Sequence, residues 1–383
     1  MLHHQVLQFV ECWLPQSMVW MHEQLLNLPP QFVPHVTCNE RANVDQFAMN
    51  NIHLTNQHPL ISRLRKIIAY RLGGIPFDFC AENLAKHIGA SLIHSHFGNV
   101  AWMNLRTASR LMVPHLVSFY GFDVRSLPTR DPVWRKRYRR LFSEVELVLA
   151  MGPNMAWELE TLGCGARKIR IHHLGVDLTH LPFRPRHPHA NQPLRILMAG
   201  TFKEKKGIPC ALEALHKLRG HVDLEITIIG DATDDYRDQL EKKRIIDTVR
   251  RLKLESIVKL LGYQPYSILI KEAYSHDIFL APSLTANDGD KEGIPMTIVE
   301  MAASGMPIVS TVHADIPEII QHGITGWLAK ENCVDELVTC LQFVISNPEK
   351  WLPALKAGRE HIEKQFDAYK QGIRLGDIYQ QLI

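Results

Sequence analysis

The sequence predicts an α/β protein made of two doubly wound units, and three observations support this prediction. Short apolar runs alternate with helical patterns along most of the 383 residues, as expected of βαβ units with parallel sheets. The alternation breaks at residues 182–193, where four prolines in twelve positions exclude a helix or a central strand. It then starts again, which divides the length between two domains of ordinary size.

Each unit contains several runs of strand length. In the first unit the expected strands are Val6–Cys12, His35–Cys38, Leu92–His96, Leu116–Tyr120, Leu147–Met151 and Ile169–His173, with helices at Asn99–Leu111 and Asn154–Leu162. In the second unit the expected strands are Arg195–Ala199, Glu225–Ile229, Val258–Leu261, Ile278–Ala281 and Pro307–Ser310, with helices at Ile208–Leu218, Arg237–Leu252, Pro295–Ala303 and Asp335–Ile345. The tail from Pro348 has a helical pattern throughout. We therefore expect domains at 1–181 and 194–362, joined by a linker at 182–193.

Composition narrows the class of protein. The seven cysteines are scattered, odd in number and form no Cys-x-x-Cys, which favours reduced thiols in a cytoplasmic chain over a disulfide or zinc framework. No run of 18 apolar residues exists, so we expect no membrane span. The short apolar run at Val6–Val10 has no preceding Lys or Arg and favours a strand over an export signal. A net charge of +3 is too balanced to indicate nucleic acid.

The positive charge is concentrated in the first half. Up to residue 180 there are 18 Lys and Arg against 13 Asp and Glu. Residues 130–140 hold six cations, with Trp134 and Tyr138 four positions apart on one helical face. Such a segment suits the anionic inner face of the plasma membrane. A solvated helix face is the common alternative, and single-stranded RNA is disfavoured by the two-domain organisation.

The most informative segment is the polar loop 287–294, which precedes a helix expected to begin at Pro295. The free N–H groups and the positive dipole end of such a helix suit a phosphate or pyrophosphate. Gly293 lets a ligand approach the backbone. Glu292 and Glu300 lie eight positions apart, and their carboxylates can accept protons from a ribose and a hexose hydroxyl. The alternative is a helix-capping loop with a solvated Glu300.

These residues resemble the signature of family 4 (GT4) of the retaining glycosyltransferases. Glu-Gly-x-Pro at 292–295 is followed by Glu-x-x-Ala-x-Gly-x-Pro-Ile-Val at 300–309, and similar motifs continue to Leu328. The string 288–295 is similar to the branch that builds exopolysaccharides, colanic acid included. The resemblance is strong from about residue 194 to 345 and weaker before 90. It implies the GT-B fold, in which two Rossmann-like domains face each other across a cleft. It also implies that the C-terminal helix, 363–383, packs back on the first domain.

The resemblance implies roles for the residues of this loop. Glu292 would contact the transferred sugar and Glu300 the ribose of the donor. Backbone amides near Gly293 and Ile294 would meet sugar or phosphate. In this family the C-terminal domain holds most of the donor.

A second loop, 200–207, contains three lysines that would neutralise a diphosphate leaving group. Lys206 matches the lysine that the family places on the diphosphate. Thr201 stands where the family has an arginine, and Lys203 is the candidate for the missing charge. The loop lacks Gly-Lys-Ser/Thr and is not a Walker loop. The alternative is a solvated basic turn.

Two further strand ends of the second unit match the family. Gly230 corresponds to a glycine that lies close to the nucleotide. Tyr263 lies in a stretch similar to the one that meets the base. A plain turn between strand and loop is the alternative at both positions.

The first unit offers candidates for the acceptor side. His94 and His96 share one strand face without an evident third ligand, which argues against a metal. The stretch resembles the family's His-x-His-Phe motif near the cleft, so His96 is an acceptor-site candidate, with a packed histidine as the alternative. Tyr120 stands where many relatives carry a histidine near the reacting sugar, and a phenol is a poor base at neutral pH. Asp123 is expected to contact the acceptor, with capping of the following turn as the alternative.

The function expected from these residues is the transfer of a hexosyl unit, with retention, from a nucleoside-diphosphate sugar to a glycan or lipid-linked acceptor in cell-surface polysaccharide biosynthesis. Lysines and the helix dipole would replace a metal, so no cofactor is expected. Asp288-Gly289-Asp290 has metal-motif spacing but lies in the glutamate loop. A sugar-nucleotide epimerase or hydrolase on this fold, or a non-catalytic partner subunit, stays open, since Thr201 and Tyr120 depart from the family. No Gly-x-Gly-x-x-Gly follows a strand, which argues against a dehydrogenase.

Overall fold

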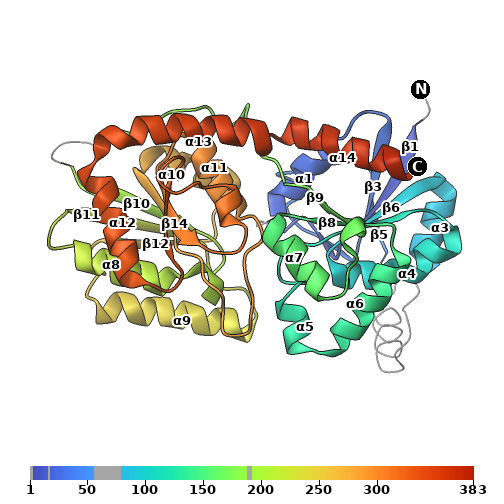
Figure 1. Cartoon of the computed structure of the whole chain (residues 1–383), viewed down its shortest axis with the longest axis horizontal. Coiled ribbons are helices and arrows are strands. Elements are labelled where there is room, and N and C mark those ends of the chain that lie inside the picture. The colour runs from blue at the N-terminus through green and yellow to red at the C-terminus, as the bar shows by residue number, and fades with distance from the viewer. Residues whose placement is uncertain (1–2, 16–17, 56–78, 188–191) are drawn as a thin grey trace. The chain divides into compact units, whose positions relative to one another are not determined.

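The computed structural model describes residues 3–15, 18–55, 79–187 and 192–383. The chain divides into two compact units (Figure 1). Unit 1 comprises Met1–Gly175 together with Ala368–Ile383, and unit 2 comprises Val176–Asp367. Each unit is an α/β layer structure with its own parallel sheet, which confirms the predicted fold class. No helix in the described ranges is long and apolar enough to cross a bilayer.

The sheet of unit 1 has seven parallel strands in the order β5-β3-β1-β6-β7-β8-β9. Its strands are β1 His4–Phe9, β3 Phe32–Cys38, β5 Ile52–Leu54, β6 Ala90–His96, β7 His115–Ser118, β8 Leu147–Ala150 and β9 Ile169–Ile171. A separate short pair is formed by β2 Cys12–Trp13 and β4 Glu40–Arg41. The helices of this unit are α1 Val19–Leu26, α3 Phe79–Ile88, α4 Gly98–Leu111, α5 Ser126–Arg130, α6 Val133–Glu144, α7 Pro153–Thr161 and α14 Ala368–Leu382.

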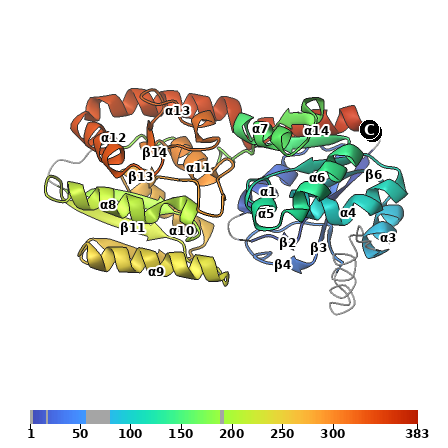
Figure 2. The same ribbon diagram turned by 60° about the horizontal axis from the view of Figure 1, so that its bottom comes forward.

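The sheet of unit 2 has six parallel strands in the order β12-β11-β10-β13-β14-β15. They are β10 Leu194–Ala199, β11 Leu224–Ile229, β12 Val258–Gly262, β13 Ile278–Ala281, β14 Ile308–Val312 and β15 Trp327–Lys330. The helices are α8 Ile208–Leu218, α9 Tyr236–Arg251, α10 Tyr266–Ser275, α11 Met296–Ser304, α12 Val334–Ser346 and α13 Trp351–Gln365. The views in Figures 1 and 2 agree that α8 and α9 run side by side.

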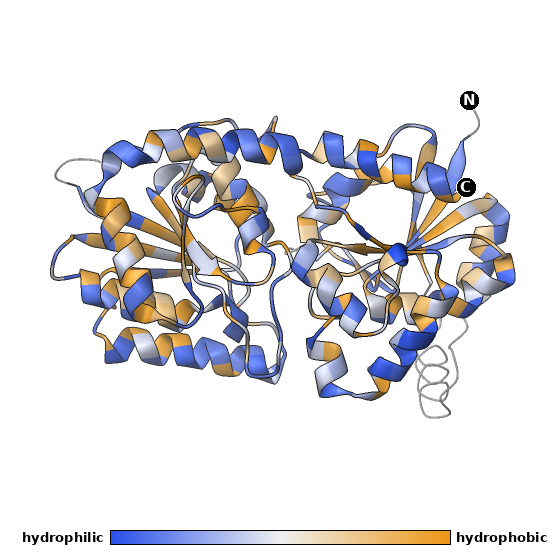
Figure 3. Cartoon of the chain, viewed as in Figure 1, coloured by the Kyte–Doolittle hydropathy of each residue, from blue (hydrophilic) through white to orange (hydrophobic). Residues whose placement is uncertain are grey.

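The strands of the unit 2 sheet are largely apolar, as expected of a parallel sheet covered by helices (Figure 3). In α8, buried residues recur at helical spacing, with Ile208, Leu212 and Leu215 facing the sheet. The core of unit 2 also takes in Trp351 of α13. The core of unit 1 takes in Tyr379 of α14. The last two helices, which adjoin in sequence, therefore belong to the cores of different units.

The C-terminal helix α14 approaches α1 closely because two of its positions are glycine. A Cβ on Gly372 would lie 2.0 Å from the carbonyl oxygen of Asn27, and one on Gly376 would lie 2.6 Å from Pro29 Cγ. Larger residues at either position would force the helix away from unit 1. The change of unit falls at Ala368 instead of the expected residue 363.

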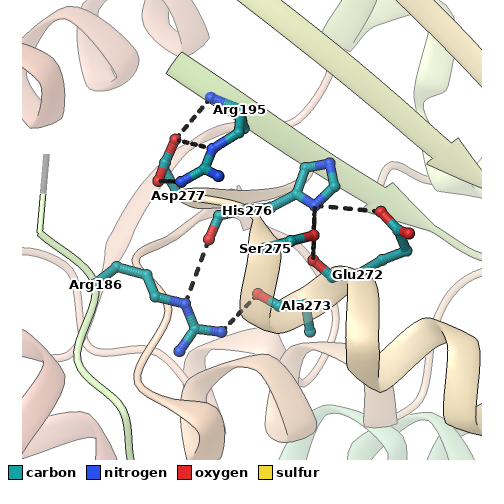
Figure 4. Close-up of polar contacts among 7 residues, drawn as sticks. All are labelled: Arg186, Arg195, Glu272, Ala273, Ser275, His276 and Asp277. Atoms are coloured by element: carbon teal, nitrogen blue, oxygen red, sulfur yellow. Dashed lines mark hydrogen bonds and ion pairs between the residues drawn. The ribbon is translucent and has the colours of Figure 1, made fainter. Parts of the chain in front are cut away.

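In the structure the first segment of unit 1 ends at Gly175, and not at the expected residue 181. Most of the described part of the expected linker is bound to unit 2, and residues 188–191 lie outside the described residues. Arg184 N and Arg186 N donate to Ser304 O and Gly305 O at 3.0 Å. The Arg186 guanidinium donates to Ala273 O at 2.6 Å (Figure 4). It also donates to Ser304 O at 2.8 Å.

Arg186 therefore lies at the carboxyl ends of α10 and α11, where a cation suits the unpaired carbonyls and the negative dipole end. Its side chain is buried and lies over the Tyr274 ring, 4.8 Å from the centroid. Burial lowers the pKa of Arg186 to about 10, so it stays charged at neutral pH. Prolines exclude regular structure in this segment, but they do not keep it from packing on one unit.

Candidate active site

In each sheet the chain first adds strands toward one edge and then returns to the middle to add strands toward the other edge. The point between the two middle strands is the topological switch point. In unit 1 this switch point lies between β1 and β6, and in unit 2 between β10 and β13. Ligands of open parallel sheets bind beyond the carboxyl ends of the strands at such points. The loops after β10 and β13 contain Lys206 and Glu292. The ends of β1 and β6 carry Gln8 and His96.

In unit 2 the two loops at the switch point interlock. Leu284 N donates to Lys205 O at 2.9 Å. A Cβ at Gly207 would lie only 2.0 Å from Pro282 O. Gly207 also has a φ of +63°, so both the close contact and the backbone conformation require glycine there. The close packing brings the lysine loop and the glutamate loop into one cluster.

Lys206 and Glu292 form the central ion pair of this cluster. Lys206 Nζ lies 2.7 Å from Glu292 Oε1, and the side chains are 21% and 8% exposed. Burial by itself would raise the pKa of Glu292, but Lys206 and Lys205 lower it to about 2. Glu292 is therefore a carboxylate at every physiological pH, and the sequence predicted both members of the pair.

Lys205, which the prediction did not single out, is the second cation of the cluster. Its Nζ lies 3.2 Å from the carboxylate of Asp290, 3.0 Å from Lys291 O and 4.0 Å from Glu292 Oε2. Burial would lower the pKa of Lys205, but Glu292 and Asp290 raise it. Asp288 Oδ1 accepts from Asp290 N at 2.9 Å. The two aspartates of the Asp-x-Asp string thus bond within this loop and to Lys205.

Two residues from later loops hold the glutamate loop and were not predicted. Glu292 N donates to His313 Nε2 at 3.1 Å, and His313 Nδ1 lies 2.7 Å from Glu331 Oε1. The other Glu331 oxygen accepts from Thr285 N at 2.8 Å. His313 can accept at Nε2 only when that nitrogen carries no proton, so Nδ1 carries the proton and donates to Glu331. The sequence could have indicated His313 as a site residue, because it directly follows the predicted strand that became β14.

Helix α11 begins at Met296, next to this cluster, as the Pro295 motif predicted. A cavity of about 20 Å³ is lined by Lys206, Ser283, Pro295 and Thr297, among others. That is room for about one water molecule. Lys206 and the residues that open α11 thus border one small space, which is too small to be a preformed nucleotide pocket.

The other predicted residues of this loop and helix are buried. Gly293 and Ile294 lie between the ion pair and the first turn of α11. Glu300 lies inside α11 and is buried, so the alternative of a solvated carboxylate is wrong.

The remaining strand ends of unit 2 meet beside β10. Gly230 N donates to Gly262 O at 2.9 Å. A Cβ on Gly230 would lie 1.9 Å from Gly200 O, which explains the glycine. Tyr263 is 45% exposed, and partial burial raises the pKa of its phenol, an effect that the nearby Thr201 opposes. Lys203 is partly exposed and precedes the short 3₁₀ turn Glu204–Lys206.

In unit 1, His96 is completely buried, and both of its ring nitrogens have partners. Nδ1 lies 2.6 Å from Tyr120 Oη and Nε2 lies 2.9 Å from Gln8 Oε1. Burial lowers the pKa of His96 to about 3, so the ring is neutral. Tyr120 is partly exposed and packs against Trp20, with ring centroids 4.6 Å apart.

Asp123 is also completely buried, and its carboxylate holds backbone. Oδ2 accepts from Gly98 N, the first residue of α4, at 2.8 Å. Oδ1 accepts from Tyr120 N at 3.0 Å and from Gly121 N at 3.1 Å. Burial raises the pKa of Asp123 to about 6, although these N–H groups lower it. The geometry is that of a helix and loop cap, the alternative that the sequence left open.

The basic segment forms α6, and one part of its interpretation is wrong. Trp134 and Tyr138 are buried, so the aromatic face points into the core. The Arg137 guanidinium lies 4.7 Å from the Trp134 ring centroid and is buried with it. Spacing of i, i+4 identifies one face of a helix but not which face meets solvent. The exposed cations of this helix are Arg135, Lys136, Arg139 and Arg140.

A chain with two parallel α/β sheets, one of which carries a charged loop cluster at its switch point, has the architecture of the GT-B class. Two family descriptions match the sequence. "Glycosyltransferase Family 4" matches residues 32–180, and "Glycosyl transferases group 1" matches residues 182–361.

Curated relatives agree with these matches. The chain is 34% identical over 300 residues to the amylovoran biosynthesis glycosyltransferase AmsK of Erwinia amylovora, which covers 78% of this chain and 72% of that protein. It is 30% identical over 297 residues to the putative colanic acid biosynthesis glycosyltransferase WcaL of Escherichia coli K12, covering 76% and 71%. The chain belongs to the family 4 glycosyltransferases, as the sequence motifs indicated.

Solved structures show the same fold. Anabaena Alr3699/HepE in complex with UDP-glucose superposes with a TM-score of 0.79 at 16% identity, over 99% of this chain and 100% of that one. A glycosyltransferase of Rickettsia africae superposes with a TM-score of 0.77 at 18% identity, over 99% and 98%. At these identities the likeness shows the fold alone.

Proposed function

We propose that this glycosyltransferase moves a hexosyl unit, with retention, from a nucleoside-diphosphate sugar to a glycan or lipid-linked acceptor during assembly of an exopolysaccharide. The names of AmsK and WcaL supply the exopolysaccharide, and UDP-glucose bound to HepE supplies the kind of donor. The observation that carries the proposal is the ion pair of Lys206 and Glu292 at the switch point beside the start of α11.

The lysine cluster suits the leaving group. When the bond between the sugar and the diphosphate breaks, negative charge develops on the phosphate oxygens. Lys206 and the first turn of α11 line one small cavity, and on this proposal both would stabilise that charge without a metal. Glu292 would accept hydrogen bonds from hydroxyl groups of the transferred sugar.

Retention fits the state of the buried groups in unit 1. His96 is neutral, with both nitrogens bonded, and the Asp123 oxygens accept backbone N–H groups. Neither is placed to take a proton from the acceptor. We therefore assign that proton to the departing phosphate oxygen, on the face where the new bond forms.

The test is a thermal-shift screen with UDP, GDP and their sugars, because a ligand of the native state raises its apparent stability. The hit is then incubated with glycan acceptors, and the anomeric configuration of the product is read by NMR. Lys206→Met should abolish the shift, whereas Lys217→Met, an exposed lysine paired with Asp335, should keep it. An inverted product would overturn retention. Free sugar alone would indicate a hydrolase, and no shift with any nucleotide would indicate a non-catalytic subunit.

We also propose that the exposed cations of α6 contact anionic lipid at the cytoplasmic face. Arg135 and Arg139 lie one turn apart on the exposed side of the helix. Their replacement by glutamine should reduce sedimentation with phosphatidylglycerol vesicles, while Lys243→Gln with Arg250→Gln on α9 should not. Equal sedimentation of both double variants would contradict the proposal.

A further inference from the structure

Two neighbouring lysines of unit 2 share one carboxylate. Lys206 Nζ lies 2.7 Å from Glu292 Oε1, and Lys205 Nζ lies 4.0 Å from Glu292 Oε2. The two ammonium groups therefore approach different oxygens of the same side chain. The other contacts of the two lysines are unlike, and this difference separates their roles.

Lys205 is held both at its side chain and at its backbone. Its Nζ lies 3.2 Å from each carboxylate oxygen of Asp290 and donates to Lys291 O at 3.0 Å. Its carbonyl oxygen accepts from Leu284 N at 2.9 Å, which ties the turn to the loop after β13. Since an ammonium has three donors, Asp290 and Lys291 O occupy most of them. Lys205 is thus fixed in place by groups other than Glu292.

Lys206 has fewer ties. Within the described residues, Glu292 Oε1 is the one acceptor at ion-pair or hydrogen-bond distance from Lys206 Nζ. The side chain also lines the small cavity at the start of α11, together with Ser283 and Thr297. A Cβ on Gly200 would lie 3.0 Å from Lys206 Cε, so the glycine leaves room beside this side chain. Of the two lysines, Lys206 is therefore the one with the freedom to exchange its partner.

Such an exchange would release one oxygen of Glu292. Oε1 is buried, and in the described part of the chain Lys206 is the one donor that reaches it. Oε2 would keep Lys205 nearby. An ionised carboxylate that is buried without a cation is disfavoured. A fixed second lysine therefore allows the first one to leave while Glu292 stays charged.

The charges around Glu292 explain the direction of the exchange. The two lysines pair with the carboxylates of Asp290 and Glu292, so these four groups carry no net charge. Two further titratable groups are bonded to backbone here, because Asp288 Oδ1 accepts from Asp290 N and His313 Nε2 accepts from Glu292 N. A diphosphate adds negative charge and offers Lys206 more acceptor oxygens than Glu292 does.

We propose that Lys205 is a positioning residue, which stays beside Glu292 as a fixed counterion while Lys206 turns from Glu292 to the diphosphate of the donor. Glu292 then stays ionised, and its Oε1 is free to accept a hydrogen bond from a hydroxyl of the sugar. The inference rests on the proposed function, in which the diphosphate lies at Lys206. It goes beyond that function because it assigns different parts to two adjacent lysines.

The first test needs no nucleotide. Lys206→Met imitates the state in which Glu292 has Lys205 alone, and a ¹³C NMR titration should show Glu292 ionised at neutral pH in this variant. Adding Lys205→Met together with Asp290→Asn, which avoids a second buried charge, should raise the pKa of Glu292 by about one pH unit or more. The matched control adds Asp290→Asn alone and keeps Lys205. If the titration of Glu292 is the same with and without Lys205, the proposal is overturned.

The second test follows the exchange in the unchanged protein, so it does not depend on the folding of a variant. The ammonium and Cε resonances of the lysines are recorded before and after saturation with UDP and, separately, with GDP. The nucleotide that binds should shift the resonances of Lys206 and leave those of Lys205 and Lys217 in place. If Lys205 shifts as much as Lys206, the donor site stands and the fixed counterion is wrong. If neither nucleotide shifts Lys206, the proposed function fails at the donor site, and the exchange fails with it.

The third test is the pH dependence of transfer to the acceptor found in the functional screen. Loss of Lys205 with Asp290→Asn should move the acid limb of kcat toward neutral by about one pH unit, which is about a tenfold loss of kcat on that limb. Lys205→Arg keeps a cation and should return the limb to its place in the wild type. A merely structural role of Lys205 would lower kcat by the same factor at every pH, and that result would overturn the positioning role.

Discussion

Replacing Lys206 by methionine tests the charge arrangement on which the donor site depends. The substitution keeps most of the side-chain volume but removes the ammonium 2.7 Å from Glu292. Glu292 is then left buried with one cation, Lys205, whose Nζ lies 4.0 Å away. Burial without a close partner disfavours the ionised carboxylate. We therefore expect the pKa of Glu292 to rise and the folded state to lose stability.

The size of the effect follows from the pKa of Glu292. Its usual value is 4.5, and in the folded protein it is about 2. This difference corresponds to about 3 kcal/mol of stabilisation of the folded state at neutral pH. Because the folded pKa is the lower one, the contribution is present above pH 4.5 and is lost as the pH falls through 2. Lys206→Met should remove about 2 to 3 kcal/mol, since Lys205 remains.

The assay is a ¹³C NMR titration of the glutamate carboxyls combined with urea unfolding at several pH values. In the variant the Glu292 carboxyl should titrate at a higher pH than in the wild type. The double variant with Glu292→Gln should regain part of the lost stability, because no unpaired charge is left buried. Lys217→Met serves as the control and should leave the titration of Glu292 unchanged. A Glu292 pKa that stays near 2 in Lys206→Met would refute the reasoning.

Three further predictions concern the surroundings of this cluster. His313→Ala removes the acceptor for Glu292 N–H and should lower the free energy of unfolding, measured in urea, by about 1 to 3 kcal/mol. It should also lower kcat by a larger factor than it raises KM for the donor. Unchanged kinetics would contradict this prediction. Gly230→Ala places a methyl group 1.9 Å from a carbonyl oxygen of the neighbouring loop, at a φ of +139°, and should lower the melting temperature by several degrees, whereas Gly220→Ala, with open space around it, should not. Arg186→Met leaves buried carbonyls at two helix ends without a donor, so it should lower the free energy of unfolding by about 2 kcal/mol or more. The affinity for UDP, measured by calorimetry, should stay within a factor of two. A large loss of affinity would show that this arginine also shapes the donor site.

The sequence singled out Lys206 and Glu292 because both lie on loops that follow strands and because both match motifs of the family that the sequence resembles. Lys206 and Glu292 lie on the loops after β10 and β13, and parallel strands bring their carboxyl ends to one edge of the sheet. Which strands neighbour each other could not be derived from the alternation of elements. The adjacency of β10 and β13, and hence the ion pair, needed the topology.

The sequence did not predict the groups that hold these residues in place. His313 and Glu331 come from loops 21 and 39 positions after Glu292, and no spacing rule connects them. Short strands were also missed, among them β5 and β15, because three or four residues carry little periodicity.

On the proposed function, the two switch points differ in a way that matches the chemistry of the two substrates. A diphosphate leaving group gains charge as it departs, and the site at Lys206 and Glu292 is built from fixed charges in a buried setting, where such charges act strongly. A sugar hydroxyl is neutral, and the buried His96 on the acceptor side of the proposal is neutral as well, while the Asp123 carboxylate accepts backbone N–H groups. Exchanging these designs would harm both sites. A further buried charge in unit 1 without a partner would be costly, and neutral groups alone beside the diphosphate would leave the developing charge without a counterion.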